Sequence, residues 1–227
     1  MSLLFDIFLP TNCLLCDALG NRICFRCEGD LGSEPRLVFR EGFVGFSAAS
    51  YNMVTQKLLR SYKELGESEL SHLMASSMLP LVQCFDHLPD FLVPVPSNRS
   101  ALRERGFNPA ELLARDLSLG LPKVRWVNLL SRARETRDQS KLNPAERRAN
   151  QTGSMVSKVG AGRVLLVDDV VTTGATLLTA KQTLENAGFF VEGFITYAET
   201  EGKKVYLDYT GLSCLQMEEH HGTKNFR

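Results

Sequence analysis

The pattern of apolar and polar positions along the chain predicts strands and helices in alternation. Short apolar or β-branched runs bounded by polar or turn-forming residues indicate strands. Apolar residues spaced three or four positions apart indicate helices. The predicted strands cover residues 42–51, 90–95, 123–130, 163–168 and 189–197, and the predicted helices cover 52–62, 67–85, 108–120 and 175–188.

The helix from 108 to 120 has residues suited to both of its ends. Asn108 suits the N-cap position, Pro109 suits the first helical position, and Glu111 is favoured near the positive end of the helix dipole. Gly120, followed closely by Pro122, indicates where the helix stops.

The C-terminal half contains a strand, a turn, a helix and a second strand in direct succession. The first strand is apolar throughout, as expected for a strand buried on both faces of a parallel sheet. This βαβ order predicts an α/β fold with a mainly parallel sheet flanked by helices.

Four cysteines near the N-terminus predict a metal-binding module. Cys13 and Cys16 form one C-x-x-C pair, and Cys24 and Cys27 form a second. Two such pairs supply the four thiolates of a tetrahedral zinc site. The alternatives are a redox dithiol, which needs only one pair, and disulfides, which are disfavoured in the cytosol.

Three regions follow from these patterns. Residues 1–38 are predicted to form a zinc-binding module, because so short a segment cannot fold around an apolar core of its own. Residues 39–200 are predicted to form the α/β domain, and residues 201–227 a polar tail. The densely charged segment from 132 to 150 indicates a solvated surface loop ending in a short helix.

Charge and hydropathy narrow the classes of function. The 227 residues include 26 basic and 26 acidic side chains, so no overall field attracts the protein to nucleic acid, although a local basic patch is compatible with this balance. No apolar run approaches the ~20 residues that span a bilayer. The N-terminus lacks the basic segment of a secretory signal. We therefore expect a cytoplasmic protein without a membrane span.

The stretch VLLVDDVVTTGAT, residues 164–176, carries the most specific chemistry. Asp168 and Asp169 follow an apolar strand, and a threonine-rich turn, residues 172–176, leads into the next helix. A turn with a glycine at a helix N-terminus offers amides and hydroxyls to a phosphate. Carboxylates suit a sugar diol or a hydrated Mg²⁺. The combination predicts a ribose 5-phosphate ligand; the alternative is a polar turn whose Asp and Thr side chains only cap the helix.

Several motifs together resemble those of the ComF/GntX family. They are the two C-x-x-C pairs, Tyr51 with Tyr62-Lys63, VPVPSNRSALRERGFN, RARETRDQ, ERRAN and VLLVDDVVTTGAT. The resemblance implies a type I phosphoribosyltransferase-like domain joined to a small N-terminal zinc-knuckle module. The ligand implied is phosphoribosyl pyrophosphate (PRPP) with Mg²⁺, the structural ion is Zn²⁺, and the implied reaction transfers the phosphoribosyl group and releases pyrophosphate.

The resemblance also implies a role for individual residues. Asp168 and Asp169 hold the ribose and count as the catalytic pair. Residues 95–98 match the pyrophosphate-binding loop, with Arg99 close by, and the charged segment after Arg132 matches a loop that closes over the ligand. The implied PRPP-binding residues are Val95, Pro96, Ser97, Asn98, Arg103, Arg105, Arg132, Arg137, Gln139, Thr172, Thr173, Gly174, Ala175 and Thr176.

Some features leave the function open. Pro109 replaces a polar residue that the family commonly has after Asn108, which removes a side chain and an amide from that position. The acceptor is not identified by sequence; residues 51–66 are the candidate segment for its pocket. The alternatives to transfer are PRPP sensing without turnover and, because ComF-like proteins are associated with natural competence, an accessory role with single-stranded DNA or the DNA-uptake machinery.

Overall fold

A computed structural model describes residues 12–31, 35–65, 68–133, 155–200 and 203–204. The strands are β1 (Arg36–Arg40), β2 (Phe43–Ser50), β3 (Phe91–Pro94), β4 (Arg125–Trp126), β5 (Leu130–Arg132), β6 (Met155–Ser157), β7 (Arg163–Val171), β8 (Phe190–Glu199) and β9 (Lys203–Lys204). The helices are α1 (Phe25–Asp30), α2 (Met53–Leu65), α3 (Ser68–Met78), α4 (Arg99–Arg105), α5 (Pro109–Leu119) and α7 (Ala175–Asn186), with a 3₁₀ helix at Leu79–Cys84.

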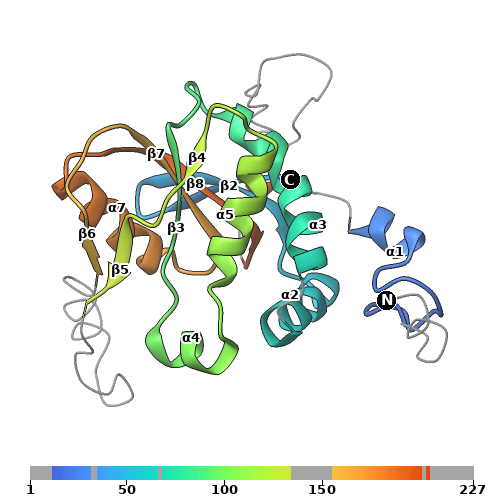
Figure 1. Ribbon diagram of the computed structural model, residues 1–227. Coiled ribbons are helices and arrows are strands. Elements are labelled where there is room, and N and C mark those ends of the chain that lie inside the picture. The colour runs from blue at the N-terminus through green and yellow to red at the C-terminus, as the bar shows by residue number, and fades with distance from the viewer. Residues whose placement is uncertain (1–11, 32–34, 66–67, 134–154, 201–202, 205–227) are drawn as a thin grey trace, which may run out of the picture.

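The main sheet is mixed but mostly parallel, as the sequence predicts. Its order is β4-β3-β7-β8-β2-β1-β9. The four pairings from the β4 edge inward, β4 with β3, β3 with β7, β7 with β8 and β8 with β2, are parallel, and β1 is antiparallel to both of its neighbours. β7 lies inside the sheet between β3 and β8, and Figure 1 shows helices on either side of the sheet.

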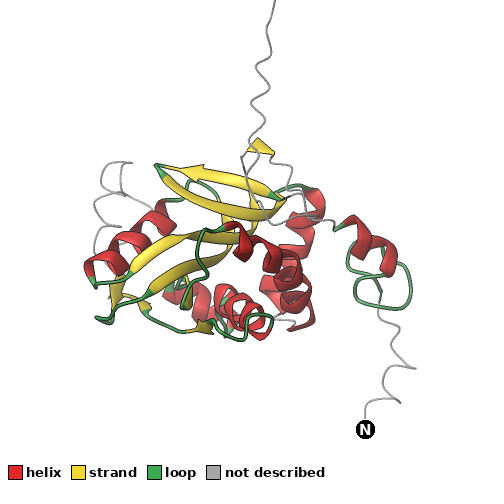
Figure 2. Ribbon diagram, turned by 90° about the horizontal axis from the view of Figure 1, so that it is seen from above, coloured by secondary structure: helices red, strands yellow, loops and turns green. Residues whose placement is uncertain are grey.

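Alternation along β7 divides the apolar core between the two faces of the sheet. Leu165 and Val167 pack in one cluster with side chains of α2, α3 and α5. Val164 and Leu166 pack in a second cluster with Leu177 and other side chains of α7. Because neighbouring strand residues point to opposite faces, one apolar run supplies both cores. Figure 2 shows the strands lying between these helical layers.

Two predicted elements differ from the observed ones because the chain turns earlier than expected. The predicted strand 123–130 is only two residues long as β4, since a tight turn in which the Leu129 amide donates to the Val127 carbonyl takes the chain off the sheet edge. It then forms β5, which pairs with β6 in a separate hairpin. The predicted helix 67–85 is α-helical only to Met78, and its 3₁₀ continuation contains Pro80, which lacks an amide hydrogen.

Several other observed elements were not predicted: β1, α1, α4, β6 and β9. β1 extends across the predicted domain boundary after residue 38 and adds a strand to the main sheet. α4 follows the loop at 95–98 directly. At the other end of the chain, β9 places Lys203 and Lys204, at the start of the predicted tail, beside β1.

The N-terminal module contacts the α/β domain through α2. Leu14, Leu15 and Ile23 pack against the apolar cluster that includes α2 and α3. The Lys57 amine of α2 donates to the Leu15 carbonyl over 3.3 Å. Within the described ranges, the helices are all too short or too polar to cross a lipid bilayer.

Candidate functional site at the carboxyl ends of the strands

The acidic pair lies where β7 extends beyond its neighbour β3. Pro94 at the end of β3 pairs with Val167, and the Val95 amide still donates to the Val167 carbonyl over 2.9 Å. β7 then continues for four residues beyond Val167 and ends at Val171, three residues past the predicted strand end at Asp168. Parallel α/β sheets bind ligands beyond the carboxyl ends of their strands, and this step between β3 and β7 is such a place.

A small cradle lies next to Asp168 at the start of α7. A cavity of about 50 Å³ is lined by Asp168 and residues 170–177. Thr172 and Thr173 are exposed, whereas Gly174 is buried at the N-cap of the helix. The predicted threonine turn therefore forms a hollow at a helix N-terminus, with the polarity that favours an anion.

Arg40 fixes the shape of this turn from outside. Its Nε donates to the Thr172 carbonyl over 2.6 Å, and its guanidinium pairs with buried Glu199 at 3.0 Å. Gly174 has a φ of +80°, and a Cβ there would lie 2.4 Å from the Arg40 Cβ. A glycine is required at this position both for the backbone conformation and for the approach of Arg40.

Asp168 and Asp169 have different surroundings. Asp168 lines the cradle on the α7 side of the sheet. Burial raises the pKa of its carboxyl well above the ordinary value, and the negative charge of Asp169 raises it further. The Asp169 amide donates to the Asp168 Oδ1 over 2.8 Å, which partly opposes these effects. The carboxyl of Asp168 therefore resists ionisation until an opposite charge approaches.

Asp169 is held by an ion pair that the sequence did not reveal. The Lys63 Nζ of α2 lies 2.6 Å from the Asp169 Oδ2. The Val170 amide donates to the Asp169 Oδ1 over 2.8 Å. Lys63 belongs to the Tyr62-Lys63 motif, but nothing in that motif indicates a partner on β7.

Two hydrogen bonds from the Asn108 side chain hold the loop at residues 95–98 in place. The Asn108 side-chain amide donates to the Val95 carbonyl over 3.1 Å, and its oxygen accepts from the Ser97 hydroxyl at 2.9 Å. The prediction that Asn108 begins a helix is confirmed, but its side chain makes no cap hydrogen bond and binds the loop instead. Asn98 is the side chain that caps, accepting from the Ala101 amide over 2.7 Å at the start of α4.

Arg132 connects this loop to the acidic pair. Its Nε donates to the Pro96 carbonyl over 3.1 Å. Burial lowers the pKa of its guanidinium, and the nearby Asp168 carboxylate partly restores it. The structure thus brings together residues 95–98, Arg132 and Asp168, three predicted parts of the site from distant positions in the chain.

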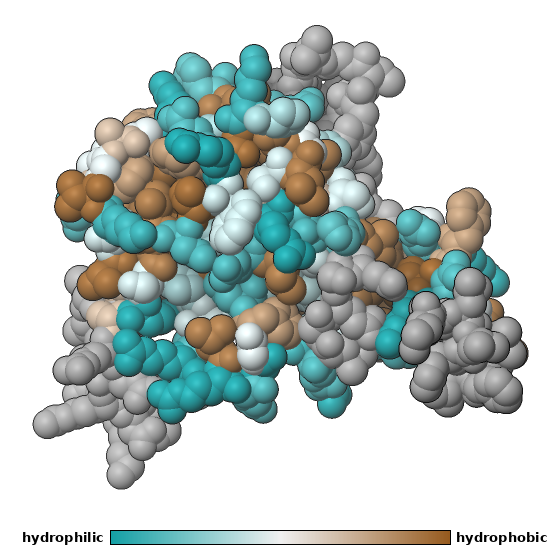
Figure 3. Space-filling model, viewed as in Figure 1, coloured by the Kyte–Doolittle hydropathy of each residue, from teal (hydrophilic) through white to brown (hydrophobic). Residues whose placement is uncertain are grey.

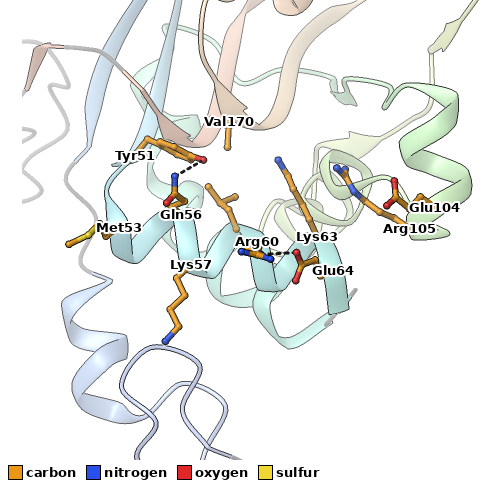
Figure 4. A pocket seen from close by; sticks show the side chains of 11 residues that line it. Tyr51, Met53, Gln56, Lys57, Arg60, Lys63, Glu64, Glu104, Arg105 and Val170 are labelled. Atoms are coloured by element: carbon orange, nitrogen blue, oxygen red, sulfur yellow. Dashed lines mark hydrogen bonds and ion pairs between the residues drawn. The ribbon is translucent and has the colours of Figure 1, made fainter.

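A larger pocket adjoins the cradle at Val170, which lines both cavities. Its volume is about 770 Å³, and it is lined by Tyr51, Met53, Gln56, Lys57, Leu59, Arg60, Lys63, Glu64, Glu104, Arg105 and Val170. Figure 4 shows Lys63 pointing toward Val170, and Arg105 reaching in from α4 on the other side. Most of the lining comes from residues 51–64, the segment predicted to hold an acceptor.

The predicted arginines differ in position. Arg105 lines the pocket, whereas Arg103 is exposed on α4 outside both cavities. Figure 3 shows hydrophilic side chains gathered over the region of α4. Arg99, at the start of the same helix, donates to the Arg132 carbonyl over 3.5 Å. Arg137 and Gln139 lie outside the described residues.

The four N-terminal cysteines converge as predicted. Their sulfur atoms all lie within 4.8 Å of one another, the cysteines are free of disulfides, and the Cys16 and Cys24 sulfurs are 3.7 Å apart. Ligands of a tetrahedral zinc ion with Zn–S bonds of about 2.3 Å lie roughly 3.8 Å apart, so the donor set fits this ion.

The thiols of the cluster differ in acidity. Burial raises the pKa of Cys13, but the amides of Cys24, Cys16 and Leu15 donate to its sulfur and together lower the pKa to about 6. Hydrogen bonding with Cys16 and burial raise the pKa of Cys27 to about 12. A cation held by the four sulfurs would supply the charge that the last thiol needs in order to ionise.

Comparison with known families identifies the domain that carries this site. Residues 100–222 match the family described as the phosphoribosyl transferase domain. The chain belongs to the phosphoribosyl transferase domain family. The family match includes β7, the threonine turn and α7, and it confirms both the resemblance and the fold class predicted from the motifs.

The curated relatives include proteins named for competence and for DNA use. The chain is 35% identical over 106 residues to Competence protein F of Haemophilus influenzae, covering 44% of this chain and 46% of the relative. It is 27% identical over 168 residues to Competence protein ComFC of Streptococcus pneumoniae, covering 71% and 66%. The DNA utilization protein YhgH of Escherichia coli K12 is 35% identical over 104 residues, covering 44% and 45%. The chain thus spans between about half and two thirds of the length of these relatives.

Solved structures of phosphoribosyltransferases also align with the chain. Adenine phosphoribosyltransferase from Thermoanaerobacter pseudethanolicus is 14% identical, with 60% of this chain and 83% of that one covered and a TM-score of 0.38. Orotate phosphoribosyltransferase from Aeropyrum pernix is 18% identical, with 72% and 73% covered and a TM-score of 0.36.

Proposed function

We propose that the protein binds Mg-PRPP at the carboxyl ends of β3 and β7 and transfers its phosphoribosyl group to an acceptor. The observation that carries the proposal is the step between these strands, where Asp168 lines the threonine cradle and directly follows Val167, whose carbonyl accepts from the Val95 amide of the loop at 95–98. A ligand with a phosphate at one end, a diol in the middle and a pyrophosphate at the other matches that order of groups.

Each part of the site has a role in this proposal. Residues 172–176 receive the 5-phosphate through amides and hydroxyls at the start of α7. Asp168 and Asp169 accept hydrogen bonds from the ribose hydroxyls or ligate the cation, and Mg²⁺, when bound, neutralises charge on the pyrophosphate. The loop at 95–98 and Arg132 meet the pyrophosphate, for which a guanidinium is a suitable donor.

The reaction follows from this placement. A nucleophilic atom of the acceptor forms a bond to C1 of the ribose while the bond from C1 to the pyrophosphate oxygen breaks. Pyrophosphate leaves with the bonding electron pair, and the proton of the acceptor passes to solvent. The protein contributes mainly by positioning both reactants and by stabilising the charge that develops on the leaving group.

The pocket beside Val170 is the proposed acceptor site. It opens next to the acidic pair, and its volume of about 770 Å³ lies within the range of small-molecule pockets. Tyr51 is partly exposed and its hydroxyl accepts from the Gln56 side chain over 3.5 Å, so both a ring face and polar groups are available to a planar acceptor.

The four-cysteine module is proposed to hold a structural Zn²⁺. The four sulfurs have the separation of a tetrahedral site, and Cys13 and Cys27 are buried. We further propose that residues 1–38 form this module, 39–200 the transferase-like domain and 201–227 a tail.

Pyrophosphate release tests the transfer step. The wild-type protein, with Mg-PRPP, is supplied in turn with purine and pyrimidine bases, nucleosides and oligonucleotides. We expect pyrophosphate to appear with one acceptor class only and to be lost in Asp168→Asn/Asp169→Asn, because both carboxylates are removed without a change in side-chain size. If the protein binds PRPP but no acceptor class leads to pyrophosphate release, the result would favour the sensing role instead.

The names of the relatives favour a second candidate, a DNA-handling role. The protein would then bind single-stranded DNA or a component of DNA uptake, with Arg99, Arg103 and Arg105 of α4 contacting phosphates. Because such contacts release counterions, DNA affinity should fall steeply with salt. Substituting Arg103 and Arg105 with Gln should reduce that salt dependence. Weak, salt-independent binding would contradict this candidate.

A further inference from the structure

Lys63 reaches from α2 to the acidic end of β7. Its Nζ lies 2.6 Å from the Asp169 Oδ2, and its side chain is 29% exposed against 12% for that of Asp169. The protein therefore shields most of the Lys63–Asp169 ion pair from solvent, and Lys63 also lines the larger pocket. Figure 4 shows the Lys63 amine directed toward Val170 and away from the Arg60–Glu64 ion pair.

The position of Lys63 matters because two carboxylates on adjacent residues repel each other. Val170, the next residue, lines both the cradle and the larger pocket, so the amine lies where the two cavities meet. An ammonium at hydrogen-bond distance makes that carboxylate oxygen a poorer ligand for a divalent cation, because the two positive charges repel at that separation.

We propose that Lys63 is the counter-cation of the Asp168–Asp169 pair in the ligand-free protein, and that a divalent cation arriving with the ligand displaces its amine from Asp169 into the neighbouring pocket. This inference rests on the proposed function, since it takes a cation-bearing ligand to bind at the acidic pair. It makes Lys63 a positioning residue that acts through Asp169.

The exchange has a consequence for the acceptor pocket. While Lys63 pairs with Asp169, its charge is neutralised. Once displaced, the amine faces the same pocket as the Arg105 side chain. The pocket thus gains one positive charge when the adjacent site fills, so occupation of the two cavities is coupled.

Binding of Mn²⁺ alone, measured by calorimetry and by electron paramagnetic resonance without PRPP, tests the exchange. Lys63→Met removes the charge and keeps much of the apolar stem. We expect this variant to bind Mn²⁺ about tenfold more tightly than the wild type, because the competing charge is gone. The gain should be lost in Lys63→Met/Asp169→Asn. A lysine that only supports the fold predicts unchanged or weaker Mn²⁺ binding in Lys63→Met, and that result would overturn the proposal.

Lys181→Met is the matched control. Lys181 also forms an ion pair, with Glu185 in the exposed surface of α7, and lies outside both cavities. Its substitution should leave Mn²⁺ binding as in the wild type. Because PRPP is absent from this experiment, its outcome is independent of whether the protein binds or turns over PRPP.

A second measurement uses the wild type and so does not depend on the folding of a variant. Lysine acylation followed by mass spectrometry reports how accessible and nucleophilic each amine is. Saturating Mn²⁺ should raise the labelling rate of Lys63 several-fold and leave that of Lys181 unchanged. Equal labelling of Lys63 with and without Mn²⁺ would show that the amine is not displaced.

Discussion

The four-cysteine cluster and the acidic end of β7 both gather groups that repel one another when ionised, but they neutralise this charge differently. The four sulfurs lie within 4.8 Å of one another, and the described part of the module has few buried apolar residues of its own. At β7, Lys63 supplies a cation from within the chain and two apolar clusters surround the strand. We therefore expect the first region to depend on a bound metal ion for its fold, and the second to be folded in the absence of a ligand.

Removal of one thiol should have the largest effect. Cys13→Ser takes away a buried ligand, and structural zinc contributes roughly 10–16 kcal/mol to the folding of such modules. We expect metal content, measured by atomic emission, to fall from about one ion per chain to almost none. Limited proteolysis should then cut within residues 12–31.

If only the cysteine module depends on the metal ion, the α/β domain that contains β7 should remain folded in Cys13→Ser. Cys84→Ser is the control, because Cys84 is buried but lies outside the cluster. If Cys13→Ser abolished the cooperative unfolding of the whole protein, rather than lowering its midpoint by a few degrees, the two regions would not differ as described.

A substitution in the core of the α/β domain should have the opposite effect: it should lower the stability of the domain and leave the metal content unchanged. Leu166 is fully buried in the cluster beneath α7, on the face of the sheet away from the module. Leu166→Ala should lower the free energy of unfolding by about 3 kcal/mol, the usual cost of such a cavity, as measured by urea titration. Metal content should stay at the wild-type value. Loss of the metal along with stability would show that the module depends on the domain.

The smallest expected effect is a rise in the melting temperature of the protein when Asp168 of the binding site is replaced by Asn. The native pKa of Asp168 is raised by burial and by Asp169, so the native state retains a proton that the unfolded state releases. Unfolding then releases a proton, and rising pH destabilises the wild type as it passes above the ordinary carboxyl range. Asp168→Asn removes this cost and should raise the melting temperature by about 2–4 °C at neutral pH.

Melting curves between pH 4 and 8 would test the sign of that effect. The advantage of Asp168→Asn over the wild type should grow with pH and then level off above the native pKa. If Asp168→Asn were less stable than the wild type at neutral pH, neighbouring groups would already offset the cost of burying the Asp168 carboxylate in the absence of ligand.

Local sequence patterns were sufficient to predict those parts of the structure that are determined by residues close together in the sequence. The apolar run before Asp168, the turn at Gly174 and the spacing of the four cysteines each determine structure within a few positions. The fold class follows from the βαβ unit because its connection admits few arrangements.

The contacts that complete the site join distant segments and were not predictable in this way. Lys63 pairs with Asp169, Arg40 holds the Thr172 carbonyl, and Asn108 bridges the loop at 95–98 instead of capping its helix. Each depends on how helices and strands pack, which no residue spacing encodes. β1 was missed for a similar reason, since its short sequence became a strand only by pairing with β2.

Calorimetric titration of the zinc-loaded protein with PRPP, with and without Mg²⁺, tests the central claim most directly. Binding in the wild type that requires Mg²⁺ and is lost in Asp168→Asn/Asp169→Asn is the result predicted by the proposed site. Failure of the folded wild type to bind PRPP under either condition, or equal binding by the double variant, would contradict it.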